Sequence, residues 1–120
     1  MKKRLQSFRY AFRGIKTVFL SEANMKIHSF ITVLVILCGA FFDISLTEWI
    51  FCLLCIALVT GAEMINTSIE NVVDLASPEL HPLAGKAKDI AAGAVLLCAI
   101  IAVIIGLLIF VPKFLNLIVL

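Results

Sequence analysis

Three long apolar stretches, separated by short polar segments, constrain this chain more than any other feature of its sequence. Residues 27–42 and 90–111 carry no formal charge, and residues 49–62 are mainly apolar. Hydrophobic residues make up 62% of the 120, and a domain of this size buries too little area to hide them. The sequence therefore predicts an all-α membrane protein, and it argues against a disordered chain, a basic nucleic-acid-binding module and a free cytosolic monomer.

Residues 1–26 form a basic segment that holds seven of the ten Lys and Arg residues. Its apolar residues recur at helical spacing, namely Leu5, Phe8, Phe12, Ile15 and Phe19. This pattern predicts an amphipathic helix that lies on the membrane surface, with its cations among the headgroups. The row of Arg9, Arg13 and Lys16 suits ATP, a phosphorylated substrate and anionic headgroups equally well, so its role stays open.

Membrane helices are expected at about 27–42, 48–76 and 82–111, within a single domain covering residues 1–120. The polar segment 43–48 (DISLTE) predicts a tight turn, and Ser77-Pro78 ends the second helix. Pro82 suits the first turn of the third helix, which Pro112 is expected to end. The second helix, at nearly 30 residues, is about 45 Å long and must project beyond the hydrocarbon.

The distribution of Lys and Arg predicts the orientation. The N-terminal segment and the 77–89 loop hold nine of them, and only Lys113 lies elsewhere. The positive-inside rule then makes the N-terminus cytoplasmic and the C-terminus external in a multi-pass protein of the cell membrane.

Small residues recur every four positions along the third membrane helix, at Ala94, Cys98, Ala102 and Gly106. Such a row allows helices to approach closely, which favours an oligomeric bundle, although an Ala-rich helix also gives such rows by chance. All four cysteines lie in apolar stretches and are interpreted as buried hydrophobic residues, without redox or zinc chemistry.

Polar residues on one face of the second membrane helix form the main candidate site. Glu63, Asn66, Glu70 and Asp74 lie at i, i+3, i+7 and i+11, within a narrow arc of the helical wheel. Acids beside lipid are costly without a cation, and hard oxygen ligands in this arrangement suit Mg²⁺ together with a phosphate substrate. The alternative is a solvated cytoplasmic face, which explains Asp74 better than Glu63.

Other charged residues share the cytoplasmic side. Glu22 is the one acid in the basic segment, and a simple salt bridge is its alternative role. Lys86, Lys88 and Asp89 open the third membrane helix, where lysines oppose the helix dipole and so suggest an anionic partner, or else a positive-inside anchor.

The region lacks a phosphate-binding loop of the Walker type, because Leu80 and Ala87 occupy positions that the motif reserves for Gly and for Ser or Thr. His81 lies in the adjoining loop and is a candidate nucleotide contact. His28, at the start of the first span, is interpreted as a polar residue at headgroup level.

Two stretches, EMINTSIENVVD (63–74) and HPLAGKAKDIAAGAV (81–95), resemble the bacterial integral-membrane diacylglycerol kinase family. The resemblance extends over nearly the whole chain. It implies an amphipathic surface helix plus three transmembrane helices in a homotrimer, with sites at subunit interfaces. It also implies transfer of the γ-phosphate of MgATP to a lipid hydroxyl.

The same resemblance assigns roles to individual residues. It makes Glu63 the general base for the lipid hydroxyl, Glu22 and Glu70 the Mg²⁺ ligands, and Asn66 a support for the metal–phosphate cluster. The remaining nucleotide-binding positions that it implies are Lys3 (usually Arg in the family), Tyr10, Glu79, His81, Lys88 and Asp89.

The segments SFRYAFRGI, HPLA and GLLIFVPK, together with His28, resemble the Gram-positive branch of the family, the undecaprenol kinases. We therefore expect undecaprenol as the acceptor, with diacylglycerol as the alternative. A hypothesis from another class is a small membrane scaffold or transporter subunit whose acids bind cations.

Overall fold

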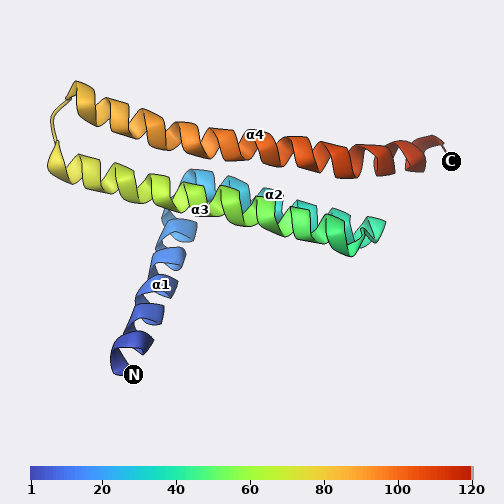
Figure 1. The fold of residues 1–120 in the computed structure, drawn as a ribbon, viewed down its shortest axis with the longest axis horizontal. Coiled ribbons are helices and arrows are strands. Elements are labelled where there is room, and N and C mark those ends of the chain that lie inside the picture. The colour runs from blue at the N-terminus through green and yellow to red at the C-terminus, as the bar shows by residue number, and fades with distance from the viewer. Residues whose placement is uncertain (120) are drawn as a thin grey trace.

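The computed structural model describes residues 1–119, which form four α-helices (Figure 1). They are α1 (Lys2–Ser21), α2 (Ala23–Phe42), α3 (Leu46–Ala76) and α4 (Pro82–Val119). Figure 1 shows α2, α3 and α4 along the long axis of the molecule, while α1 runs away from them crosswise. The described part of the chain is therefore all-helical, as predicted.

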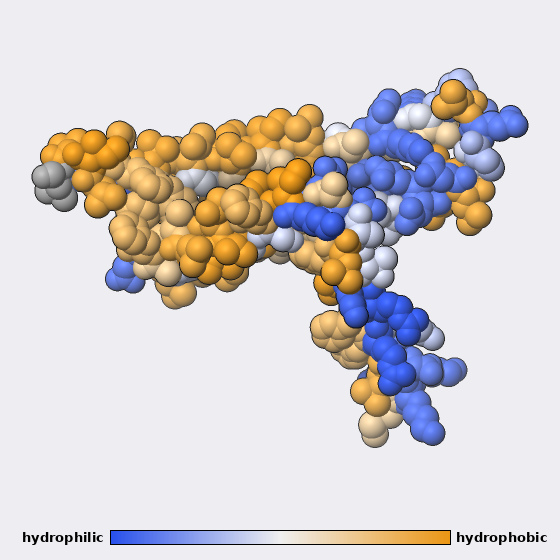
Figure 2. Space-filling model, turned by 180° about the vertical axis from the view of Figure 1, so that it is seen from behind, coloured by the Kyte–Doolittle hydropathy of each residue, from blue (hydrophilic) through white to orange (hydrophobic). Residues whose placement is uncertain are grey.

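Apolar side chains cover the outside of the bundle of α2, α3 and α4. Figure 2 shows hydrophobic residues over most of its length, and hydrophilic residues gathered along α1 and at the end that carries the α3–α4 loop. Each of the three bundle helices is long and apolar enough to cross a membrane. This confirms the three predicted membrane helices, because so much exposed apolar surface requires a lipid environment.

Glu22 separates α1 from α2, four residues earlier than the predicted boundary at residue 26. Its backbone is extended (φ −92°, ψ 123°), yet its N–H donates to the Val18 carbonyl and its own carbonyl accepts from the Lys26 N–H. The chain thus changes direction at a single residue without leaving that residue's backbone groups unpaired. Residues 23–26 extend α2 to 20 residues, which removes the apparent shortness of the first span.

The turn between α2 and α3 is shorter than the predicted segment 43–48. Asp43 adopts the left-handed conformation (φ 48°, ψ 56°) that commonly ends a helix. Ser45 and Glu48 form a capping box, in which the Glu48 N–H donates to Ser45 Oγ at 3.2 Å and the Ser45 N–H donates to Glu48 Oε1 at 3.0 Å. Helix α3 therefore begins at Leu46, two residues before the expected start.

The prediction that Pro112 ends the last helix is wrong, since α4 continues through it to Val119. A proline inside a helix removes one backbone hydrogen bond and crowds the preceding turn. In lipid, however, leaving the helix would expose many unpaired backbone groups, which costs more than the single lost bond. The apolar residues that follow Pro112 therefore remain helical.

A buried apolar cluster lies at the α2–α3 turn. Ile44, Cys52 and Ile109 form a buried cluster there, and Phe42 packs edge-on against Phe114 with ring centroids 4.8 Å apart. Lys113 Nζ lies 2.6 Å from Glu48 Oε2 and joins the last turns of α4 to the start of α3. This end anchors the bundle and leaves the opposite end for the polar residues of the candidate site.

Candidate active site

The polar row on α3 runs from the interior of the bundle to its exposed end. Glu63 and Asn66 are buried, at 2% and 6% relative exposure, Glu70 is half-buried, and Asp74 is exposed. α3 has no proline or internal cap that would turn these residues off one face, so the predicted row is intact. Glu63 is therefore the most buried residue of the row. The alternative that the row is only a solvent-exposed cytoplasmic face does not account for this burial.

Asn66 and Glu70 form a small oxygen-rich cluster one turn beyond Glu63. Asn66 Nδ2 donates to Glu70 Oε1 at 3.2 Å, which orients both side chains. Asn66 Oδ1 is buried and accepts no hydrogen bond. A buried acceptor without a partner is rare in folded proteins and marks a place where a cation or a donor group of a ligand fits.

Glu63 lies opposite His28, a residue of the neighbouring helix α2. His28 Nε2 lies 3.9 Å from Glu63 Oε2, and the two side chains are 19% and 3% exposed. Among residues 1–119, no other basic group lies within 4.0 Å of this carboxylate. The interpretation of His28 as a polar residue at headgroup level did not foresee its approach to Glu63.

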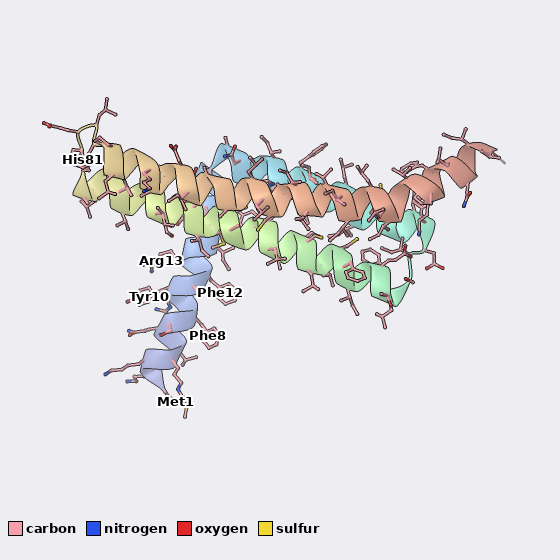
Figure 3. The ribbon with its side chains drawn as sticks, turned by 45° about the horizontal axis from the view of Figure 1, so that its top comes forward. Met1, Phe8, Tyr10, Phe12, Arg13 and His81 are labelled. Atoms are coloured by element: carbon pink, nitrogen blue, oxygen red, sulfur yellow. The ribbon has the colours of Figure 1, made fainter. Side chains whose placement is uncertain are left out.

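A polar cavity of about 350 Å³ lies between α1 and α3. Two predicted nucleotide-binding residues, Tyr10 and Glu22, line it, and Arg13 lies over the Tyr10 ring with its Cζ 5.6 Å from the centroid (Figure 3). Sequence reasoning did not select the cavity's contributions from α3, namely Thr67, Ser68 and Asn71. Thr67 and Asn71 follow Glu63 at i+4 and i+8, a signal that could have identified them.

Lys88 contributes a cation at the start of α4, beside the exposed end of the acidic row. Its Nζ lies 2.5 Å from Asp74 Oδ1. Lys88 precedes the apolar run that begins at Ile90, and its contact with Asp74 places a cation at this end of the acidic row.

The loop before α4 places two further predicted residues at the same end. His81 Nδ1 accepts a hydrogen bond from the Leu83 N–H at 3.1 Å, and the Glu79 carbonyl accepts one from Ser77 Oγ at 2.9 Å. His81, Glu79 and Asp89 are all exposed. Lys3 lies near the free end of α1, away from the bundle (Figure 1), so the chain does not bring it to the other candidates.

The described residues of one chain do not complete a metal centre. Within residues 1–119, no three His, Cys, Asp or Glu side chains come close enough together to hold an ion. Glu22, in the break between α1 and α2, and Glu70, on α3, are the predicted ligands, and each is half-buried.

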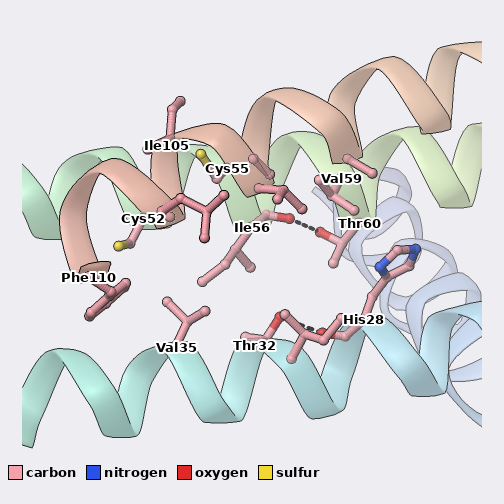
Figure 4. Close-up of a pocket in the computed structure, with 16 residues that line it drawn as sticks. His28, Thr32, Val35, Cys52, Cys55, Ile56, Val59, Thr60, Ile105 and Phe110 are labelled. Carbon is pink, nitrogen blue, oxygen red and sulfur yellow. Dashed lines mark hydrogen bonds between the residues drawn. The ribbon is translucent and has the colours of Figure 1, made fainter. Parts of the chain in front are cut away.

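An apolar groove of about 310 Å³ runs between α2, α3 and α4 (Figure 4). Val35 and Phe110 lie toward one end, and His28, Thr32 and Thr60 lie toward the other. Cys52 and Cys55 line it as free thiols, and Cys52 is buried while Cys55 is half-buried.

Comparison with known proteins identifies the family. Residues 9–110 match the family described as prokaryotic diacylglycerol kinase. A protein named undecaprenol kinase from Bacillus subtilis is 44% identical over 108 residues, covering 90% of this chain and 88% of its own. Proteins named diacylglycerol kinase from Synechocystis and from Escherichia coli K12 are 42% and 30% identical, covering 96% and 79% of this chain and 66% and 78% of their own. The chain therefore belongs to the prokaryotic diacylglycerol kinase family.

Proposed function

We propose that this protein is a membrane lipid kinase that transfers the γ-phosphate of ATP to the hydroxyl of undecaprenol. The observation that carries the proposal is the buried Glu63 carboxylate, followed along α3 by the Asn66–Glu70 cluster. The 44% identical relative named undecaprenol kinase supports this acceptor. Diacylglycerol is the second candidate, supported by the names of the other relatives.

Glu63 acts as the general base in this proposal. The lipid hydroxyl gives its proton to the carboxylate as its oxygen forms a bond to the γ-phosphorus, while the bond from that phosphorus to the ADP oxygen breaks. Phosphoryl transfer needs positioning and charge neutralisation more than covalent catalysis, so a few well-placed polar residues suffice. A buried base also keeps water from competing with the lipid as acceptor.

The Asn66–Glu70 cluster offers part of a site for Mg²⁺, the ion that accompanies ATP in kinases, and the proposed site adds Glu22. Glu70 and Glu22 supply hard carboxylate oxygens, and the unpartnered Asn66 Oδ1 offers one more oxygen beside Glu70. When bound, the ion would neutralise the phosphate charge that develops during transfer. Glu22 and Glu70 would hold it, and Asn66 would support the metal–phosphate cluster.

In this proposal the nucleotide binds at the same end of the bundle and contacts both the polar cavity, which α1 and α3 line, and the charged start of α4. Tyr10 and Arg13 offer a ring and a guanidinium at the cavity wall, and Lys88 offers a charge for phosphate. Glu79, His81 and Asp89 would line the nucleotide from the exposed side. Lys3 would join the site only by contact with another subunit or with a moved α1.

We further propose a homotrimer in the bacterial cell membrane, with the N-terminus cytoplasmic, the C-terminus external and α1 on the membrane surface. The exposed side chains of Phe8 and Phe12 point to the opposite side of α1 from Tyr10 and Arg13 (Figure 3). Exposed apolar side chains along α4, such as Leu96 and Leu108, leave a surface on which a second copy could pack. The small residues Ala102 and Gly106 instead line the groove between α2, α3 and α4 of one copy.

The decisive experiment assays the purified protein in detergent with ATP, Mg²⁺ and either undecaprenol or diacylglycerol. We expect phosphorylated undecaprenol as the preferred product. A preference for diacylglycerol would overturn the acceptor assignment alone. Absence of any phosphorylated lipid would overturn the kinase proposal and favour the cation-binding scaffold. A mass measurement of the active species in detergent tests the trimer, and an active monomer would refute it.

A further inference from the structure

His28 and Glu63 approach each other without forming a direct hydrogen bond. The separation of 3.9 Å between His28 Nε2 and Glu63 Oε2 exceeds the range of an N–H···O contact. One oxygen atom placed about 2.9 Å from the nitrogen and about 2.7 Å from the carboxylate spans this separation with an angle of roughly 90° at the oxygen. The two side chains are therefore spaced to hold a single hydroxyl between them.

The neighbouring hydroxyl side chains are not available for that purpose. Thr32 Oγ1 donates to the His28 carbonyl at 2.8 Å, and Thr60 Oγ1 donates to the Ile56 carbonyl at 2.7 Å (Figure 4). Each threonine thus uses its only O–H within its own helix. The imidazole N–H of His28 is the remaining side-chain donor at this end of the groove.

We propose that His28 binds the acceptor hydroxyl of the lipid and orients it toward Glu63. This inference rests on the proposed lipid kinase function and adds a substrate-binding residue to it. The Nε2–H of His28 donates to the hydroxyl oxygen, while the hydroxyl proton is directed at Glu63 Oε2. During transfer the O–H bond breaks, the proton passes to Glu63, and His28 keeps its own proton.

The chemistry of the proposed acceptor gives this contact its importance. A long isoprenoid alcohol has one polar group, so the enzyme has only that hydroxyl by which to fix the reacting end. Two partners at nearly a right angle define the position of its oxygen, whereas Glu63 alone would leave it free to rotate about one hydrogen bond. A diacylglycerol has ester carbonyls as additional acceptors and depends less on a single donor.

The test compares the variants His28→Ala, His28→Gln and Thr32→Val in the full-length protein. Each is assayed for undecaprenol and diacylglycerol phosphorylation at saturating ATP, and for the KM of ATP. Thr32→Val is the matched control, because it removes a hydroxyl one turn along the same helix and preserves volume. Loss of one hydrogen bond to the substrate corresponds to about a tenfold fall in kcat/KM for that substrate.

For His28→Ala we expect kcat/KM for undecaprenol to fall about tenfold or more, a smaller fall for diacylglycerol, and a KM for ATP within twofold of wild type. His28→Gln should recover part of the loss, since its amide N–H also donates. Thr32→Val should behave as wild type.

Three results would overturn the inference. The first is an unchanged kcat/KM for undecaprenol in His28→Ala. The second is an equal fall in kcat/KM for both lipids together with a raised KM for ATP in that variant, and the third is an equal fall in kcat/KM for undecaprenol in Thr32→Val. A wild-type protein that phosphorylates neither lipid would instead remove the proposed function on which the inference rests, so the two failures are distinguishable.

Discussion

Lys88 on α4 and Asp74 on α3 form an ion pair, with Nζ and Oδ1 2.5 Å apart, at the open end of the acidic row. Their side chains are 41% and 64% exposed, so solvent screens the attraction and the pair contributes little to stability. The pair nevertheless keeps a cation close to the cluster where phosphate is expected to bind. We expect a phosphate group to replace Asp74 as the partner of Lys88.

Replacement of Lys88 tests this interpretation. We expect Lys88→Met to raise the KM for ATP on the order of tenfold, because it removes a charge-assisted hydrogen bond to phosphate. Asp74→Asn should change the KM for ATP less than about threefold, because it removes only a screened surface partner. Steady-state kinetics with varied ATP measures both. Equal effects of the two variants would mean that the pair itself, and not the lysine charge, supports binding.

Glu63→Gln should abolish most turnover while the protein stays folded. The substitution removes the proton acceptor but preserves volume, and loss of a general base typically costs about 10² to 10⁴ in kcat. Glu48→Gln is the matched control, since it changes another carboxylate of α3 at the opposite end of the bundle, beside Lys113. That control should keep kcat within about twofold. Circular dichroism in detergent checks folding, and a Glu63→Gln protein with wild-type kcat would exclude Glu63 as the base.

Chelation of Mg²⁺ should stop the reaction, and added Mg²⁺ should restore it. Glu22→Gln and Glu70→Gln each remove one hard oxygen ligand, so the Mg²⁺ concentration that gives half-maximal rate should rise about tenfold or more. A titration of rate against Mg²⁺ at fixed ATP measures the change. A normal titration for one variant would remove that glutamate from the metal site without affecting the assignment of the other.

Gly39→Ala should destabilise the protein at the α2–α3 turn. A Cβ at this position would lie 2.6 Å from Cη2 of the Trp49 ring, and overpacking of this kind costs about 1–3 kcal/mol. Gly93→Ala is the control, because a Cβ there meets no atom within 4 Å and alanine favours the helix. Thermal unfolding in detergent should show a lower Tm only for Gly39→Ala. An unchanged Tm for that variant would mean that the ring moves aside at no cost.

The sequence predicted the helices well because each membrane span is a local pattern of apolar residues. It also predicted the row from Glu63 to Asp74, since helical spacing alone puts those residues on one face. The prediction at Pro112 was wrong because proline's tendency to end a helix is a local property. In lipid, the neighbouring backbone groups have no water to bind and therefore stay in the helix. The pairing of His28 with Glu63 joins residues 35 positions apart and depends on how α2 packs against α3, which no local pattern reveals.

The crosswise placement of α1 has a kinetic consequence. With α1 on the membrane surface, as proposed, the cavity between this helix and the bundle opens where water meets lipid. Nucleotide then arrives by diffusion in three dimensions, whereas a lipid alcohol reaches Glu63 only by lateral diffusion in two. For a lipid kinase of this shape, the rate follows the mole fraction of the alcohol among the surrounding amphiphiles. Dilution with inert detergent or lipid therefore slows the reaction even when the total amounts of enzyme, ATP and alcohol stay the same.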